Sequence, residues 1–392
     1  MIRIGLFQDC YYPLVDGVCE VVDHYARGLQ GRAEVTVFVP RIPGRPFDDS
    51  VFPYRVVRCN SVPVPVVDYA LPVPDLTPGY LKLVEETKLD LVHVHSPFTI
   101  GRLGIRYGTT HQVPVVATLH SQFHRDFKRA VGSEALGLSM ARSLLSCFRQ
   151  CDECWAVNGA MEDLLHEQYG VLGPSRVMRN ATDMVTAEHP GMLRRGINKK
   201  FGLSTKEVVF LFVGRLNNLK NVFLIADSLA YVKARTDKPF RMLFIGTGQD
   251  EKRLKERVKM LGIEDRVIFA GKITNRGILA AAYQRADLFL FPSLYDASSL
   301  VQVEAASQCT PALFVRGAVT AQTVTPEVNG FVAEENPKDY GEKILSLMKD
   351  PKRVREVGKN AHRDLYLRWD DVIDEVYENY ERLIRTKPGG YS

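Results

Sequence analysis

Residues 291–311 of the 392-residue chain read FPSLYDASSLVQVEAASQCTP. The stretch leaves a short apolar run typical of a buried strand, turns at Asp296, and opens a helical pattern that carries Glu304. The start of a helix offers free backbone N–H groups and a positive dipole end, which suit a phosphate. The two carboxylates can reach different parts of an extended polyhydroxylated ligand. The stretch therefore predicts a strand, turn and helix of an α/β fold with a ligand at the turn.

The same alternation of short β-branched runs with longer helical patterns continues along the whole chain, as in βαβ units that build parallel sheets. Two sheets are predicted. The first has strands at residues 2–7, 35–39, 91–95, 113–119, 154–157 and 177–178, and the second at residues 208–213, 242–245, 267–269, 288–291, 312–315 and 330–332.

The chain is longer than the roughly 100–200 residues of a usual domain, so two domains are expected. Residues 187–191 followed by the basic run 194–200 form a composition break, which predicts a linker near residues 185–205. We expect an N-terminal domain over residues 1–190 and a C-terminal domain over 191–368. A last helix over 369–386 carries an apolar stripe and must pack on one of them.

A second charged turn lies at the end of the predicted strand 208–213. Gly214-Arg215-Leu216 follows that strand, and Lys220 stands near the start of the next helix. An arginine fork and a lysine point charge at one sheet edge both suit a pyrophosphate. Taken with Asp296 and Glu304, the two cations indicate a clamp for a diphosphate leaving group.

This half resembles the donor domain of the family 4 retaining glycosyltransferases. The resemblance rests on Gly214-Arg215-Leu216, on Lys220, on Gly246-Thr247-Gly248, on the spacing from Asp296 to Glu304, and on Thr310-Pro311. It implies a GT-B architecture: an α/β fold of two Rossmann-like, doubly wound parallel-sheet domains that face a central cleft, with the acceptor bound by the first domain and the nucleotide-sugar by the second. It also implies that the last helix crosses back to the first domain.

The resemblance assigns roles to these positions. Arg215 and Lys220 would bind the donor pyrophosphate, Glu304 the ribose hydroxyls and Asp296 the transferred sugar. The donor-binding set it implies comprises Gly17, Gly214, Arg215, Lys220, Gly246, Gly248, Asp296, Ser299, Leu300, Val301 and Glu304. Gly246 and Gly248 would let the backbone approach the nucleotide.

The chain departs from the family pattern at three places. Asp296 stands where the family has Glu, which shortens the reach of the carboxylate by about 1.5 Å. Ser298-Ser299 replaces the usual pair after that acid, and Cys309 replaces the glycine before Thr-Pro.

The first half carries a glycine loop and a histidine at predicted strand ends. Gly17 lies near the end of the loop 9–18 after the first strand, where it would let a phosphate approach backbone N–H groups. His120 follows the predicted strand 113–119, and the resemblance gives it contact with the transferred sugar. The stretches 9–29, 93–98 and 117–121 most resemble glycosyltransferases that act on diacylglycerol, and His95 is expected to shape a strand end.

The expected reaction develops negative charge on a departing nucleotide diphosphate, so it mainly needs fixed cations. His120, Arg215, Lys220 and Asp296 are the candidate catalytic residues. No Asp-x-Asp pair occurs in the chain, and no cysteine set completes a zinc site, so we expect no metal and no cofactor. The resemblance implies retention of the anomeric configuration.

The acceptor is predicted to be a lipid or a glycan, and the donor a UDP-sugar by preference. Residues 120–129 and 142–149 interleave basic with apolar side chains, which fits either an anionic membrane surface or a solvated basic face. With no apolar run of about 18 residues and an odd number of cysteines, a cytoplasmic protein, peripheral on the inner membrane face, is expected. No nucleic-acid partner is expected.

Two other classes of protein remain open. A nucleotide-sugar epimerase shares the paired-sheet architecture but would convert the donor without consuming an acceptor. A noncatalytic protein that binds sugar nucleotides or glycans would never release the nucleotide. A dinucleotide oxidoreductase is disfavoured, because no Gly-x-Gly-x-x-Gly follows the first predicted strand.

Overall fold

The computed structural model describes residues 1–14, 16–64, 70–186 and 190–387. The chain forms two compact units, which are described separately. Unit 1 consists of Met1–Asn180 with Trp369–Ser392, and unit 2 of Ala181–Arg368. Residues 181–186, which the sequence assigned to the first domain, thus group with unit 2.

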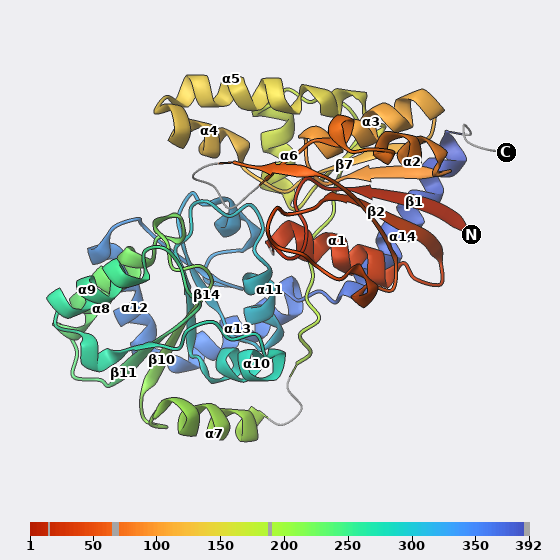
Figure 1. Ribbon diagram of the computed structural model, residues 1–392. Helices are drawn as coiled ribbons and strands as arrows, with labels where there is room; N and C mark the ends of the chain where they lie inside the picture. Colours follow the sequence, from red (N-terminus) through yellow and green to blue (C-terminus); the bar gives the residue numbers. More distant parts are fainter. Residues whose placement is uncertain (15, 65–69, 187–189, 388–392) are drawn as a thin grey trace. The chain divides into compact units, whose positions relative to one another are not determined.

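Unit 1 is built on a parallel sheet with helices on both faces (Figure 1). The strand order is β3-β2-β1-β6-β7-β8-β9, so the chain winds outward from the middle in both directions. The strands are β1 (Ile2–Phe7), β2 (Ala33–Pro40), β3 (Arg55–Cys59), β6 (Leu91–Val94), β7 (Val115–Leu119), β8 (Glu153–Ala156) and β9 (Ser175–Val177). The helices are α1 (Gly17–Gly28), α2 (Tyr80–Glu86), α3 (Thr99–His111), α4 (Phe123–Val131), α5 (Glu134–Leu145), α6 (Gly159–Asp163) and α14 (Trp369–Thr386).

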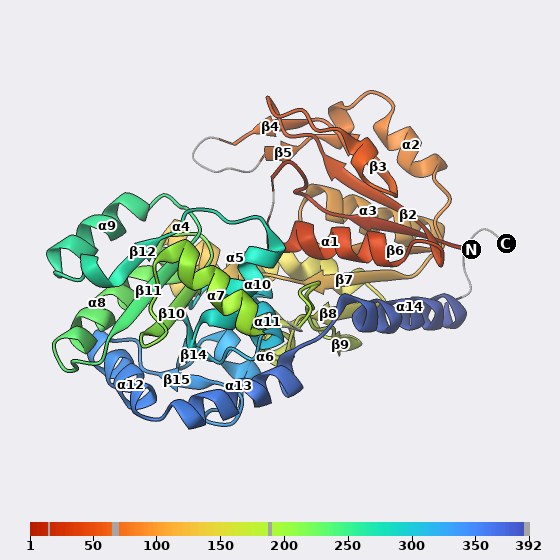
Figure 2. The same ribbon diagram turned by 90° about the horizontal axis from the view of Figure 1, so that it is seen from below.

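Helix α14, the last of the chain, packs in unit 1 (Figure 2). Its Tyr380 ring stacks on Trp155 of β8 at 5.5 Å between centroids. Ile373 lies against Gly28 of α1, where an added Cβ would meet it at 2.6 Å. Arg382 forms an ion pair with Glu153. The apolar stripe read from the sequence is therefore buried against α1 and β8.

Unit 2 has the same architecture in a six-stranded parallel sheet of order β12-β11-β10-β13-β14-β15. The strands are β10 (Val208–Val213), β11 (Phe240–Ile245), β12 (Val267–Phe269), β13 (Leu288–Phe291), β14 (Ala312–Val315) and β15 (Phe331–Ala333). The helices are α7 (Pro190–Phe201), α8 (Val222–Lys233), α9 (Glu251–Met260), α10 (Arg276–Arg285), α11 (Leu300–Ser307), α12 (Pro337–Lys349) and α13 (Pro351–Leu365). The strands are almost wholly apolar, as expected for a sheet covered on both faces.

The structure adds strands that the sequence analysis missed. β3 extends the first sheet beyond β2, and β4 (Ser61–Pro63) pairs with β5 (Ala70–Pro72) in a small antiparallel sheet. The two arginines of β3, Arg55 and Arg58, broke the apolar pattern, because an edge strand needs less apolar surface than a central one.

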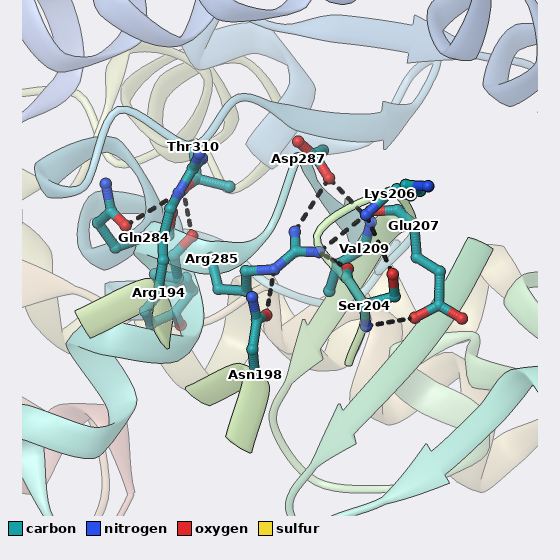
Figure 3. A network of polar contacts seen from close by, with 11 residues as sticks. Arg194, Asn198, Ser204, Lys206, Glu207, Val209, Gln284, Arg285, Asp287 and Thr310 are labelled. Atoms are coloured by element: carbon teal, nitrogen blue, oxygen red, sulfur yellow. Dashed lines mark hydrogen bonds and ion pairs between the residues drawn. The ribbon is translucent and has the colours of Figure 1, made fainter. Parts of the chain in front are cut away.

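The linker predicted near residues 185–205 is wrong for residues 190–201, which form a helix, and residues 187–189 lie outside the described part of the chain. Helix α7 covers the basic run and packs on α10. Arg285 of α10 lies within this contact in Figure 3: its guanidinium donates to Asn198 Oδ1 of α7 at 2.6 Å, and at 3.0 Å to the backbone oxygens of Ser204 and Glu207. Polar partners far apart in the sequence thus attach α7 to unit 2.

Candidate functional site

In each sheet the winding direction reverses once, and ligands of doubly wound folds bind at the carboxyl ends of the strands beside that reversal. In unit 2 it lies between β10 and β13, and in unit 1 between β1 and β6. The loops that follow β10 and β13 contain five of the site residues predicted from the sequence, Gly214, Arg215, Lys220, Asp296 and Ser299.

Lys220 and Asp296 meet at the reversal of unit 2. Lys220 ends a 3₁₀ turn after β10, and Asp296 lies in the loop after β13. The lysine Nζ lies 2.5 Å from Asp296 Oδ1, and both side chains are largely buried. Because an ammonium has three donors, this ion pair leaves Lys220 able to donate to a further acceptor such as a phosphate oxygen.

The loops after β10 and β11 pack directly on each other. An added Cβ on Gly246 would lie 1.9 Å from the backbone oxygen of Gly214, and one on Gly248 would lie 2.3 Å from that of Leu216. Gly214 and Gly246 also adopt positive φ angles of 150° and 136°. Backbone packing is therefore sufficient reason for Gly246 and Gly248, and the positive φ for Gly214. Their contact with a nucleotide stays a prediction.

Glu304 is buried in α11, and both of its oxygens accept hydrogen bonds. Arg276 donates to Oε1 at 2.6 Å, and the Tyr283 hydroxyl donates to Oε2 at 3.0 Å. Burial raises the pKa of Tyr283 well above its usual value, so this hydroxyl remains a donor. Arg276 also pairs with Asp183. Arg276 and Tyr283 were missed by the sequence analysis, since nothing in their local pattern separates them from other helix residues.

Arg215 and the start of α11 complete the predicted donor set in unit 2. Arg215 is an exposed residue shortly after β10. Ser299 precedes α11 with no cap hydrogen bond from its side chain, ahead of Leu300 and Val301 in the first turn. The Ser299 side chain thus does not cap the first amides of α11, while Gln302 N donates to the backbone oxygen of Ser299 at 3.0 Å.

Cys309 replaces the glycine expected after α11 and still adopts the left-handed conformation, with φ at 58°. Its backbone N–H donates to Ala306 O at 3.0 Å, and that of Thr310 to Ala305 O at 2.9 Å. This is the position just past a helix end where glycine is usual, because a Cβ is disfavoured there.

We expect Cys309→Gly to stabilise unit 2 by about 1 kcal/mol, because it removes that Cβ. Differential scanning calorimetry should show a midpoint about 2–4 °C higher. Cys309→Ala, which keeps a Cβ and removes the thiol, serves as the control and should show no rise. An equal rise in both variants would trace the effect to the thiol instead.

Gly17 begins α1 in unit 1, directly after Asp16. Asp16 Oδ1 accepts from the amides of Val18 and Cys19, both at 2.9 Å. Asp16 thus caps the start of α1 through these two amides. The approach of a phosphate at Gly17 stays a prediction. Apart from the chain neighbours of Gly17 and the backbone of its own helix, no described atom lies within 4 Å of where its Cβ would be, so packing against other elements does not explain this glycine.

The loop after β6 is fastened to the end of β1 by Asp9. Its carboxylate accepts from Ser96 Oγ at 2.5 Å, Ile100 N at 2.7 Å and Gly101 N at 3.1 Å. An added Cβ on Gly101 would lie 1.6 Å from Ser96 O. The strand end that carries His95 is therefore rigidly positioned.

His120 follows β7 and lies beside His95, with His120 Nε2 3.0 Å from His95 Nδ1. Burial lowers the pKa of His120 to about 4, although Asp16 opposes the shift. Burial and the neighbouring imidazoles lower the pKa of His95 well below its usual value. Both rings are neutral at pH 7.

The described residues include one group of three side chains whose donor atoms could share a metal ion: those of Cys10, Asp16 and Cys19, which lie within 4.8 Å of one another. Asp16 already caps α1, and Cys19 Sγ donates to Cys10 O at 3.4 Å. All seven cysteines are free thiols. Among the described residues, no helix has both the length and the apolar character needed to cross a membrane.

Both halves of the chain match known families. Residues 15–185 match the family described as Glycosyltransferase Family 4, and residues 194–364 match Glycosyl transferases group 1. An alpha-monoglucosyldiacylglycerol synthase of Streptococcus pneumoniae is 26% identical over 318 residues, covering 79% of this chain and 70% of the relative. A protein of the same name from Acholeplasma laidlawii is 23% identical, covering 92% and 91%.

Solved structures share the fold of the chain. Sucrose-phosphate synthase from Thermosynechococcus elongatus has a TM-score of 0.77 at 19% identity, with 98% of this chain and 100% of that chain covered. HepE from Anabaena, solved with UDP and glucose, has a TM-score of 0.75 at 17% identity, with 97% and 99% covered. Two Rossmann-like units of this kind form the GT-B fold.

Proposed function

Because this chain belongs to glycosyltransferase family 4 and is a glycosyltransferase that uses nucleotide-sugar donors, we propose that it moves a hexosyl group from a UDP-sugar to a lipid acceptor. The anomeric configuration is retained and no metal takes part. Unit 2 is the donor-binding domain and unit 1 is the acceptor-binding domain. Residues 181–186 belong to unit 2.

The observation that carries this proposal is the pairing of Lys220 with Asp296 at the reversal of the second sheet. A cation for the phosphate and a carboxylate for the sugar stand next to each other, as a diphosphate-sugar requires. Glu304, held by Arg276 and Tyr283, offers its remaining lone pairs to ribose hydroxyls.

The reaction needs its strongest stabilisation where the departing diphosphate gains charge. Lys220, Arg215 and the amides of Ser299, Leu300 and Val301 supply fixed positive ends there, each worth roughly 3 kcal/mol by analogy with oxyanion donors. These groups take the place of a metal clamp. The donor phosphate itself serves as the base on the same face of the sugar, which retains the configuration.

The names of the relatives support the choice of donor and acceptor. Two relatives are named alpha-monoglucosyldiacylglycerol synthases, which favours a diacylglycerol-type lipid over a glycan. HepE was solved with UDP-glucose, which favours a uridine nucleotide.

A panel of UDP-, GDP- and ADP-sugars tests the proposal. Since a ligand that binds only the folded state raises its melting temperature, a UDP-hexose should give the largest thermal shift. With a diacylglycerol acceptor present, nucleotide should be released and a glycolipid formed, with and without EDTA. A larger shift with a GDP-sugar overturns the uridine preference, and loss of activity in EDTA overturns metal independence.

The same panel distinguishes the two other candidate functions. An epimerase would interconvert UDP-hexoses with no acceptor consumed. A noncatalytic binding protein would show the shift without any nucleotide release.

The helices α4 and α5 are the candidate surface for contact with an anionic membrane. They lie side by side (Figure 1) and expose Val131, Leu136 and Met140. Residues 142–149 were expected to interleave basic with apolar side chains on this surface. That expectation is wrong for Leu145 and Phe148, because both side chains are buried.

Basic side chains surround this surface, but several already have structural partners. Arg102, Arg142 and Arg149 each donate to a backbone oxygen of unit 1, and Lys128 pairs with Glu134. Basic side chains that are paired in this way are still attracted to anionic lipid, but more weakly than unpaired ones. We therefore propose peripheral binding on the cytoplasmic membrane face, in which the exposed apolar side chains contribute as much as charge.

Vesicles rich in anionic lipid should retain the protein at low salt and release it at high salt. Leu136→Asp should weaken this binding about tenfold, because it removes roughly half of the transfer free energy of a buried leucine side chain. Met260→Asp places the same change on an exposed residue of α9 and serves as the control. Equal retention of the wild type and Leu136→Asp would exclude this surface.

A further inference from the structure

Three histidines of unit 1 lie in a row at the carboxyl ends of β6 and β7. The ring centroids of His93 and His95 are 4.0 Å apart, and those of His95 and His120 are 5.3 Å apart with the rings nearly parallel. Tyr25 of α1 covers the first two rings from the side. The row is thus enclosed by the sheet and a helix, with only the His120 end partly exposed.

The hydrogen bonds along this row are unevenly distributed. Both nitrogens of His93 have partners, the hydroxyls of Tyr380 and Thr118, each at 2.6 Å. His95 Nδ1 pairs with His120 Nε2 at 3.0 Å. His95 Nε2 is buried and has no partner among the residues that the structure describes.

The unpartnered nitrogen limits where the protons can lie. A neutral imidazole carries one N–H, and His95 and His120 are both neutral at pH 7. If His120 donated from Nε2, His95 would carry its own proton at Nε2, as a buried N–H with no acceptor. If His95 donates from Nδ1, only a lone pair is left unpartnered. Buried orphan N–H groups are the rarer of the two in native proteins.

We infer that His95 is a positioning residue, which donates from Nδ1 to His120 Nε2 and holds His120 in the tautomer protonated at Nδ1. His120 then has no lone pair left for a ligand, so it acts as a hydrogen-bond donor through Nδ1 and not as a general base. The further step, that this N–H binds a hydroxyl or phosphate oxygen of the nucleotide-sugar, rests on the proposed function.

The tautomer can be measured directly in the unmodified protein. In long-range ¹H–¹⁵N correlation spectra of the ¹⁵N-histidine-labelled full chain at pH 7.5, His120 should show a protonated Nδ1 and an unprotonated Nε2. His120→Gln assigns its signals by their loss. A protonated Nε2 on His120 overturns the inference, whatever the enzyme's substrate is.

Two substitutions of His95 separate the positioning role from simple packing. His95→Asn places an amide N–H near the position of the imidazole Nδ1, whereas His95→Leu fills the space without a donor. We expect His95→Leu to lower kcat for UDP-hexose transfer about tenfold, the effect of one neutral hydrogen bond, and His95→Asn to stay within about threefold of wild type.

Melting temperatures and spectra complete the test. Equal losses of kcat in both variants at matched melting temperature overturn the positioning role. If the spectra show the Nδ1–H tautomer but no nucleotide-sugar is ever turned over, the proposed function fails while the assignment of the proton stands.

Discussion

Lys220→Met should lower kcat for sugar transfer by about 10²–10³-fold, the usual cost of removing one fixed donor at a developing oxyanion. The ion pair with Asp296 leaves two of the three ammonium donors for the diphosphate. These contacts strengthen as charge moves onto the leaving group, so kcat should fall more than KM for the donor rises. Steady-state kinetics with a UDP-hexose measures both.

The structure offers a matched control for this substitution. Lys255, an exposed lysine of α9, pairs with Glu251 at 2.6 Å in the same unit, so Lys255→Met makes the same chemical change away from the β10 and β13 loops. It should leave kcat unchanged. Since Lys220→Met also leaves Asp296 without this partner, its melting temperature must be compared with that of Lys220→Met/Asp296→Asn. A kcat within threefold of wild type in Lys220→Met would remove this lysine from the chemistry.

Glu304→Ala should abolish the thermal shift caused by UDP, with a loss of affinity of about 10²-fold. Hydrogen bonds to a charged group contribute roughly 1.5–3 kcal/mol each, and one or two ribose hydroxyls are expected to use this carboxylate. Wild type should accordingly prefer UDP over 2′-deoxy-UDP, and the variant should lose that preference. Isothermal titration with the two nucleotides measures the difference.

A second carboxylate of unit 2 controls for general destabilisation. Glu207 pairs with Arg241 at the opposite end of the sheet, near the start of β10, so Glu207→Ala breaks a similar ion pair far from the β10 and β13 loops. It should lower the melting temperature without changing nucleotide preference. Tyr283→Phe removes the donor to Glu304 Oε2 and should reduce the preference for the ribonucleotide only in part. An unchanged preference in Glu304→Ala would end the ribose role.

Much of the fold could be read from the sequence, because strands covered on both faces appear as nearly continuous apolar runs. The predicted bounds at residues 2–7, 208–213, 267–269, 288–291 and 312–315 are those of β1, β10, β12, β13 and β14. The edge strand β3 was missed because its two arginines break the apolar pattern, and the helix α7 was missed because its polar partners lie far away in sequence. Arg194 of α7, for example, donates to the backbone oxygen of Gln284 at 3.0 Å.

The candidate site was predictable as residue types at strand ends and not as contacts. Lys220 and Asp296 could be assigned to one sheet edge, since parallel strands end together. Their ion pair, and the donors Arg276 and Tyr283 that fix Glu304, depend on side-chain packing between elements, which no local pattern encodes.

The sequence by itself determined two α/β units and the chemistry at their strand ends, because apolar periodicity and strand-end charges are local properties of the chain. Two features were decided only by the tertiary structure. Gly246 must be a glycine because the backbone of Gly214 lies against it. The ring nitrogen of His120 that carries the proton depends on a buried, unpartnered nitrogen of His95. Both depend on atoms brought together from distant segments, where steric exclusion and unmet hydrogen bonds act over a few ångströms of space.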